Sequence, residues 1–155
     1  MTSAVQHRVR TQDGIALAAD CYGHDDARPV VLLLHGGGQN RHAWSTSARR
    51  LHACGYTVVA YDTRGHGDSD WDPEGDYDIH RLAADLEAIV AERFPERRPV
   101  VVGASLGGMT AMLSLGAGND VARALVLVDV TPRLEAEGVE RVGEFMRSGF
   151  DGFAS

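Results

Sequence analysis

The sequence predicts an α/β domain built around a mostly parallel β-sheet. Short, largely apolar runs recur along the chain, and segments with helical spacing separate them. Apolar runs of this kind are typical of strands buried on both faces, as in a parallel sheet. Two earlier strands are joined by Asp13-Gly14, a tight hairpin signal, which adds antiparallel strands at the N-terminus. Repeating strand–helix units after this hairpin favour the α/β class.

The first elements follow in order from the hairpin. Residues 6–11 alternate loosely between polar and apolar side chains, and residues 15–22 resume as the second strand. A buried strand is expected at 30–34, a helix at 41–53 and another strand at 56–61.

A helix with one apolar face is expected next. Its apolar residues are Ile79, Leu82, Leu86, Ile89 and Val90. Asp78 fits the N-cap position, and Pro95 ends the helix. Buried strands are then expected at 100–102 and 124–128, and an amphipathic helix at 135–147.

One serine closely follows the apolar strand at 100–102. Ser105 is the centre of a Gly-x-Ser-x-Gly pattern over 103–107, and a helix-forming run at 109–115 comes next. Alone, this pattern also fits a plain loop. At a sharp strand-to-helix turn, however, the glycines let strand and helix approach closely. Such a turn exposes the Ser105 hydroxyl at the positive end of a helix and frees the Leu106 N–H to bind an oxyanion.

The glycine run Gly36–Gly38 follows the strand at 30–34 and His35. By itself, this run also fits a flexible turn. Beside a serine nucleophile, an N–H of the loop after such a strand is the second oxyanion donor. Our first choice for this donor is Gly37, and Gly38 is the second. We expect His35 to orient the loop through hydrogen bonds rather than to react.

A carboxylate follows the last apolar strand. Asp129 could orient a histidine there, or it could equally cap the turn at Thr131-Pro132. The carboxyl ends of parallel strands meet at one edge of a sheet, where chemistry gathers in α/β folds. The loop after His35, Ser105 and Asp129 are therefore expected to lie at the same edge.

Two other segments carry titratable side chains. Asp62 and His66 could act as a base or bind a metal, but we favour a compact turn in which Asp62 and Arg64 bond locally. The acidic run over 68–72 begins like a calcium loop, yet Pro73 stands where that loop requires glycine. We interpret the run as a solvated loop, and we expect no metal site.

Composition excludes several classes of function. The chain has 155 residues, a net charge of −7 and 15 basic residues. All of them are Arg and they form no basic stripe, so we expect no nucleic-acid partner. No apolar run reaches the roughly 18 residues of a membrane span, and residues 1–7 lack a secretory pattern. Cys21 and Cys54 are interpreted as buried or half-buried thiols in a reducing compartment. We therefore expect a cytoplasmic protein with a small-molecule substrate and no cofactor.

Taken together, these motifs resemble the α/β-hydrolase superfamily, over residues 8 to 135. The motifs are Leu34–Gly38, Asp62–Ser69, Gly103–Gly108 and Leu127–Asp129. The resemblance implies Ser105 as the nucleophile, with the Leu106 and Gly37 amides as the oxyanion hole. A serine here argues against the superfamily's epoxide hydrolases and haloalkane dehalogenases, which have aspartate at this position. It fits esterases, lactonases, carbon–carbon bond hydrolases and cofactor-free perhydrolases.

The resemblance breaks at the catalytic base. The family order is serine, then acid, then histidine, whereas all seven histidines of this chain precede Ser105. We therefore expect residues 1–134 to be the N-terminal part of the hydrolase core and 135–155 the start of its cap, so that the fold is incomplete in this chain. A second chain carrying the C-terminal part would supply the base and also the acid. The strand at 124–128 would otherwise be an apolar sheet edge, which is an aggregation template.

The functional hypothesis is a serine hydrolase of small esters or related carbonyl compounds that works through an acyl-enzyme. This chain alone is expected to be inactive, because a serine without a base is a poor nucleophile at neutral pH. A carbon–carbon bond hydrolase or perhydrolase of the same superfamily is the nearest alternative. An alternative of another class is a hydrolase-like protein that binds a ligand without turnover.

Overall fold

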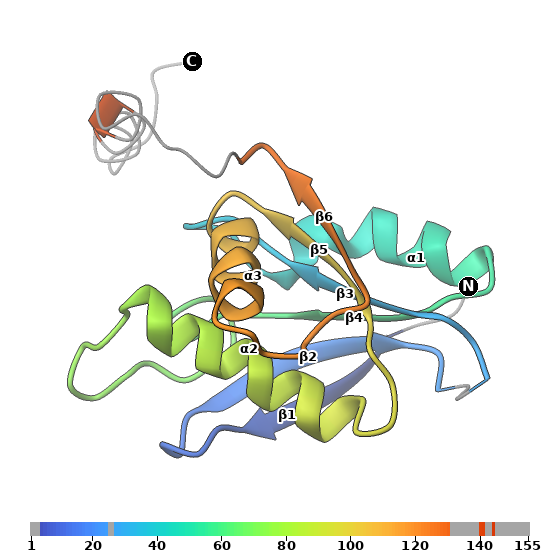
Figure 1. Cartoon of the computed structure of the whole chain (residues 1–155), viewed down its shortest axis with the longest axis horizontal. Helices are drawn as coiled ribbons and strands as arrows, with labels where there is room; N and C mark the ends of the chain where they lie inside the picture. The colour runs from blue at the N-terminus through green and yellow to red at the C-terminus, as the bar shows by residue number, and fades with distance from the viewer. Residues whose placement is uncertain (1–3, 25–26, 131–139, 142–143, 145–155) are drawn as a thin grey trace.

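The fold is a single mixed β-sheet with helices on both faces (Figure 1). The computed structural model describes residues 4–24, 27–130, 140–141 and 144. Within them, six strands lie in the order β1-β2-β4-β3-β5-β6. Their bounds are β1 Val5–Arg10, β2 Ala16–Tyr22, β3 Val30–Leu34, β4 Thr57–Tyr61, β5 Val100–Ala104 and β6 Ala124–Val128.

Pairing within the sheet follows the predicted arrangement. β2 is antiparallel to both β1 and β4, whereas the pairs β3–β4, β3–β5 and β5–β6 are parallel. The α/β fold class, with antiparallel strands at the N-terminus and a mostly parallel remainder, is therefore confirmed.

Helices cover both faces of the sheet. The helical elements are the 3₁₀ turn η1 Arg41–Trp44, α1 Ser45–Ala53, α2 Ile79–Arg93 and α3 Leu106–Gly116. α2 and α3 lie together on one face and α1 lies on the other (Figure 1). Alternate residues of β3 divide between the two cores: Leu32 packs in the cluster that includes α2 and α3, and Leu33 in the cluster with α1. This alternation explains why the strand is apolar at every position.

Local signals place the ends of α2 where they were expected. The Asp78 carboxylate accepts a hydrogen bond from the backbone N–H of His80, as an N-cap does. The helix ends at Arg93, directly before Phe94 and Pro95. The predicted helix at 41–53 instead begins with one turn of 3₁₀ helix, η1.

Strand β6 forms one edge of the sheet, as the sequence predicted. Val126, Leu127 and Val128 are 46%, 36% and 40% exposed, so the edge is apolar. The region expected to begin the cap, 135–155, lies almost wholly outside the described residues. Of the helix predicted at 135–147, only residues 140, 141 and 144 are described, and each is helical.

The two cysteines differ in environment. Cys21 is buried in β2, as expected, but Cys54 is exposed, which corrects its interpretation as a half-buried thiol. Cys54 is the C-cap residue of α1, in the turn that leads to β4. No helix among the described residues is long and apolar enough to cross a membrane.

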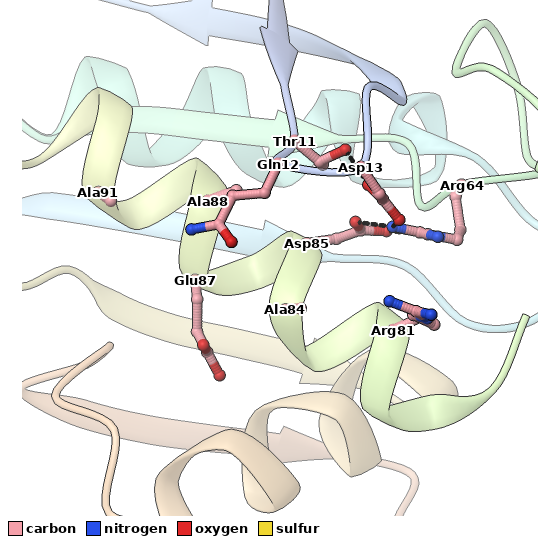
Figure 2. Close-up of a pocket in the computed structure, with 10 residues that line it drawn as sticks. All are labelled: Thr11, Gln12, Asp13, Arg64, Arg81, Ala84, Asp85, Glu87, Ala88 and Ala91. Carbon is pink, nitrogen blue, oxygen red and sulfur yellow. Dashed lines mark hydrogen bonds and ion pairs between the residues drawn. The ribbon is translucent and has the colours of Figure 1, made fainter.

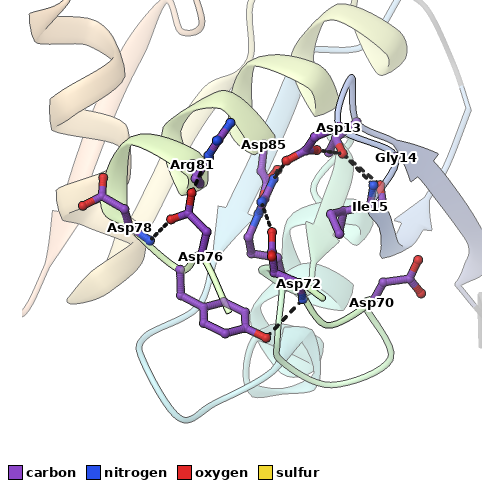
Figure 3. Close-up of polar contacts among 12 residues, drawn as sticks. Asp13, Gly14, Ile15, Asp70, Asp72, Asp76, Asp78, Arg81 and Asp85 are labelled. Carbon is purple, nitrogen blue, oxygen red and sulfur yellow. Dashed lines mark hydrogen bonds and ion pairs between the residues drawn. The ribbon is translucent and has the colours of Figure 1, made fainter. Parts of the chain in front are cut away.

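One buried arginine connects the loop after β4 to α2 and to the first hairpin. Arg64 is 1% exposed, and its guanidinium forms a two-pronged pair with Asp85 of α2, at 2.7 and 2.5 Å. Asp72 and Asp13 lie 3.1 and 3.0 Å from the same guanidinium (Figure 3). The partners of the Arg64 guanidinium lie on α2, on the first hairpin and further along its own loop, so the predicted local bond between Asp62 and Arg64 is wrong. Asp62 does bond within the turn, where its carboxylate accepts the Asp68 N–H.

Replacing Asp85 by Ala should destabilise the fold by about 2–4 kcal/mol, because it leaves part of a buried positive charge uncompensated. The matched control is Asp76→Ala, which breaks the exposed Arg81–Asp76 ion pair and should change stability little. Urea unfolding of both variants measures the difference. Equal effects of the two substitutions would contradict the structural role of Arg64.

Candidate active site

The candidate nucleophile stands on a strained turn between β5 and α3. Ser105 has φ +45° and ψ −111°, a backbone conformation that residues other than glycine rarely adopt. Two backbone bonds hold the turn: the Ser105 N–H donates to Val128 O of β6, and Ser105 O accepts from Met109 N–H. The side chain is exposed at the N-cap of α3. The turn predicted from the sequence is therefore present, with its hydroxyl accessible.

Glycines let strand and helix touch backbone to backbone beside this turn. A Cβ atom added at Gly103 would lie 2.5 Å from Gly108 N and 2.6 Å from Gly107 C. One added at Gly107 would lie 2.6 Å from Leu34 Cβ and 2.7 Å from Leu34 O. Contacts this short with backbone atoms cannot relax by moving a side chain. The small residues two before and two after Ser105 are therefore required by packing, as the sequence predicted.

The glycine loop, Gly36–Gly38, follows β3 and His35 and lies against the Ser105 turn. A Cβ atom added at Gly36 would be 3.6 Å from Ser105 Cβ, and one added at Gly37 would be 3.7 Å from Leu106 Cδ2. Leu106 is the first residue of α3, so its N–H has no partner inside the helix. The structure thus brings together Ser105, Leu106 and Gly37, which were predicted from the sequence as the nucleophile and the two oxyanion donors.

Two histidines join the glycine loop to the loop after β4. His35 is fully buried; its Nε2 accepts the Thr63 N–H at 3.0 Å, and its Nδ1 lies 2.8 Å from Gly36 O. Burial lowers the pKa of His35 and favours its neutral form. His66 Nε2 accepts the Gly38 N–H at 3.1 Å. His35 therefore holds the loop by hydrogen bonds, as expected.

A second buried arginine, Arg41, fixes the base of the loop after β4. Its backbone N–H donates to Asp62 Oδ1 at 2.5 Å, and its guanidinium pairs with the other Asp62 oxygen. The same guanidinium reaches Asp20 at 3.0 Å and Asp68 at 2.8 Å. Asp62 is fully buried, so it serves this anchor rather than acting as a base. No local sequence pattern marks an arginine that will be buried, so Arg41 was not predicted.

Asp129 stands next to Ser105 at the same edge of the sheet. Ala104 pairs with Val128 in the parallel register, so Ser105 and Asp129 directly follow paired residues of β5 and β6. Asp129 is exposed and has φ +53°. No hydrogen bond joins Ser105 Oγ to a histidine within the described part of the chain, which includes all seven histidines.

A hollow of about 250 Å³ lies elsewhere, between the first hairpin and α2 (Figure 2). Its lining residues are Thr11, Gln12, Asp13, Arg64, Arg81, Ala84, Asp85, Glu87, Ala88 and Ala91. Arg64 already pairs with the carboxylates of Asp85 and Asp13, so its positive charge is compensated by the protein itself. Across the described residues, no group of three or more His, Cys, Asp or Glu side chains is arranged to hold a metal ion.

Comparison with known proteins agrees with this architecture. The family model described as the alpha/beta hydrolase fold matches residues 29–155. The chain belongs to the α/β-hydrolase family. A crystal structure of an alpha/beta hydrolase from Novosphingobium aromaticivorans superposes with a TM-score of 0.82 at 33% identity. It covers 94% of this chain, which in turn covers 50% of that hydrolase.

Two curated members of the family are similar in sequence. An esterase of Mycobacterium tuberculosis is 42% identical over 104 residues, which are 67% of this chain and 34% of the esterase. A probable protein phosphatase methylesterase of Caenorhabditis elegans is 34% identical over 132 residues, or 82% of this chain and 36% of that enzyme. The chain therefore spans about a third of the length of these relatives.

Replacing Gly103 by Ala should destabilise the protein by about 2–3 kcal/mol, because the new methyl group meets backbone atoms of α3 that cannot move aside. Gly116, at the end of the same helix, is the matched control, since a Cβ atom there meets nothing within 4 Å. Gly116→Ala should be neutral or stabilise by less than about 1 kcal/mol. Urea unfolding compares the two, and a harmless Gly103→Ala would contradict the close contact.

Proposed function

We propose that the protein is a serine hydrolase of small esters, with Ser105 as its nucleophile. The observation that carries this proposal is the exposed Ser105 hydroxyl on a strained turn at the N-terminus of α3. Storing strain at one residue is characteristic of functional sites. In the proposed reaction, Ser105 Oγ attacks the ester carbonyl, the alcohol leaves with a proton, and water hydrolyses the acyl-enzyme to release the acid and regenerate Ser105.

The oxyanion of each tetrahedral intermediate would be held by two backbone amides, those of Leu106 and Gly37. The Leu106 N–H lies in the first turn of α3, where the helix dipole favours negative charge. Gly37 lies beside Leu106, since a Cβ atom added at Gly37 would be 3.7 Å from Leu106 Cδ2. The Gly38 N–H, our second choice, already donates to His66, which supports Gly37 as the donor.

The general base would come from a part of the whole protein that follows this chain. Both ring nitrogens of His35 and of His66 are engaged by backbone groups, so neither is free to take the Ser105 proton. Asp129, beside Ser105 in the strand register, would orient the incoming histidine. The apolar edge at β6 offers a strand surface on which the remainder of the fold could pair.

Ester hydrolysis by the whole protein should fall by about 10⁴-fold or more in the Ser105→Ala variant, because the nucleophile is removed. Ser47→Ala, which changes an exposed serine on α1, is the control and should leave the rate unchanged. Release of p-nitrophenol from p-nitrophenyl acetate and butyrate measures both rates. The 155-residue chain alone, without a base, should be about 10²–10⁴-fold slower than the whole protein.

Two results would overturn the proposal. Retained activity in Ser105→Ala would remove the nucleophile from the mechanism. A whole protein that binds small carbonyl compounds but hydrolyses none would favour the alternative of a ligand-binding protein without turnover.

A further inference from the structure

We propose that His66 is a positioning residue for the oxyanion hole. Its ring fixes the glycine loop by accepting the Gly38 N–H, so that the Gly37 N–H remains as the available donor beside the Ser105 turn. The catalytic part of this proposal rests on the proposed function, whereas its structural part does not. Nothing in the sequence pattern singled out His66 for this role.

The hydrogen bonds of His66 define its protonation state. The Gly38 N–H can only donate, and it lies 3.1 Å from His66 Nε2, so Nε2 must carry a lone pair. The carbonyl oxygen of Arg64 can only accept, and it lies 3.1 Å from His66 Nδ1, so the proton is on Nδ1. The ring is therefore neutral and in one tautomer, with both nitrogens bonded to backbone groups.

The contacts of the glycine loop leave one amide available. The Gly36 N–H donates to Gln39 Oε1 at 3.1 Å, and the Gly38 N–H donates to His66. Among the described residues, the Gly37 N–H alone of these three has no hydrogen-bond partner. Gly38 also has φ +73°, a backbone conformation that glycine adopts at little cost. The bond to His66 holds Gly38 there and keeps its amide from competing with Gly37.

The rings of His66 and His35 lie next to each other but differ in their exposure to solvent. Their ring centroids are 5.1 Å apart, and each ring joins the glycine loop to the loop after β4. His35 is fully buried, whereas His66 is half-exposed. Removing the acceptor at His66 Nε2 would leave the Gly38 N–H without its partner.

The structural part is tested by amide hydrogen exchange of Gly38, followed by ¹H–¹⁵N NMR at a single pH. The Gly38 amide should exchange at least about tenfold faster in His66→Leu, because its acceptor is lost. Its rate should stay close to that of the wild type in His66→Gln, which restores an acceptor oxygen, and in His80→Gln, which changes an exposed histidine at the start of α2. An unchanged Gly38 exchange rate in His66→Leu would overturn the proposal.

The catalytic part is tested by hydrolysis of p-nitrophenyl acetate by the whole protein. In His66→Leu, kcat should fall by about 10–100-fold with KM within about twofold, because the lost interaction acts on the intermediate rather than on the substrate. His66→Gln restores an acceptor oxygen and should recover kcat to within about threefold of the wild type. A merely structural role would not give this recovery together with an unchanged KM.

The two failures are distinguishable. An unchanged kcat in His66→Leu, with an active wild type, would overturn the positioning role. A protein that hydrolyses no ester but shows faster Gly38 amide exchange in His66→Leu would reject the proposed function and the catalytic part, and would leave the hydrogen bond of His66 established.

Discussion

The direct backbone contact between β5 and α3 is the constraint on which the candidate site depends. A Cβ atom at Gly103 of β5 would meet the backbone of Gly107 and Gly108 in α3, and one at Gly107 would meet Leu34 of β3. This contact forces the chain to reverse over one residue, which explains the positive φ of Ser105 and the exposure of its hydroxyl. The same reversal aims the first turn of α3 at the space above the serine, so one packing contact positions both the nucleophile and a donor.

The second half of the site is held by polar groups rather than by apolar packing. The loops after β3 and β4 carry backbone groups that no strand or helix satisfies, and two histidines bond several of them. Two buried arginines also hold the loop after β4. Arg41 pairs with Asp62 of that loop, and Arg64 of the loop pairs with Asp85 of α2. Burying these charges is costly unless every one is paired. The loops at the carboxyl edge of the sheet are therefore held by polar contacts, and the exposed Ser105 lies beside them.

The sequence predicted the parts of this fold whose causes are local. Apolar runs marked the strands, Asp78 and Pro95 marked the ends of α2, and the glycine spacing marked the Ser105 turn. It did not predict the ion pairs, because Arg41 meets Asp62 and Arg64 meets Asp85 across 21 positions of sequence. The hydrogen bond from the Gly38 N–H to His66 likewise depends on how two loops meet.

Covalent labelling tests whether Ser105 is the nucleophile. The whole protein would be treated with a fluorophosphonate, which reacts with activated serines, and its intact mass and peptide map would be measured. One adduct per protein is expected, located on Ser105 and absent from the Ser105→Ala variant. Labelling of another serine, or an unlabelled protein that still hydrolyses esters, would contradict this role of Ser105.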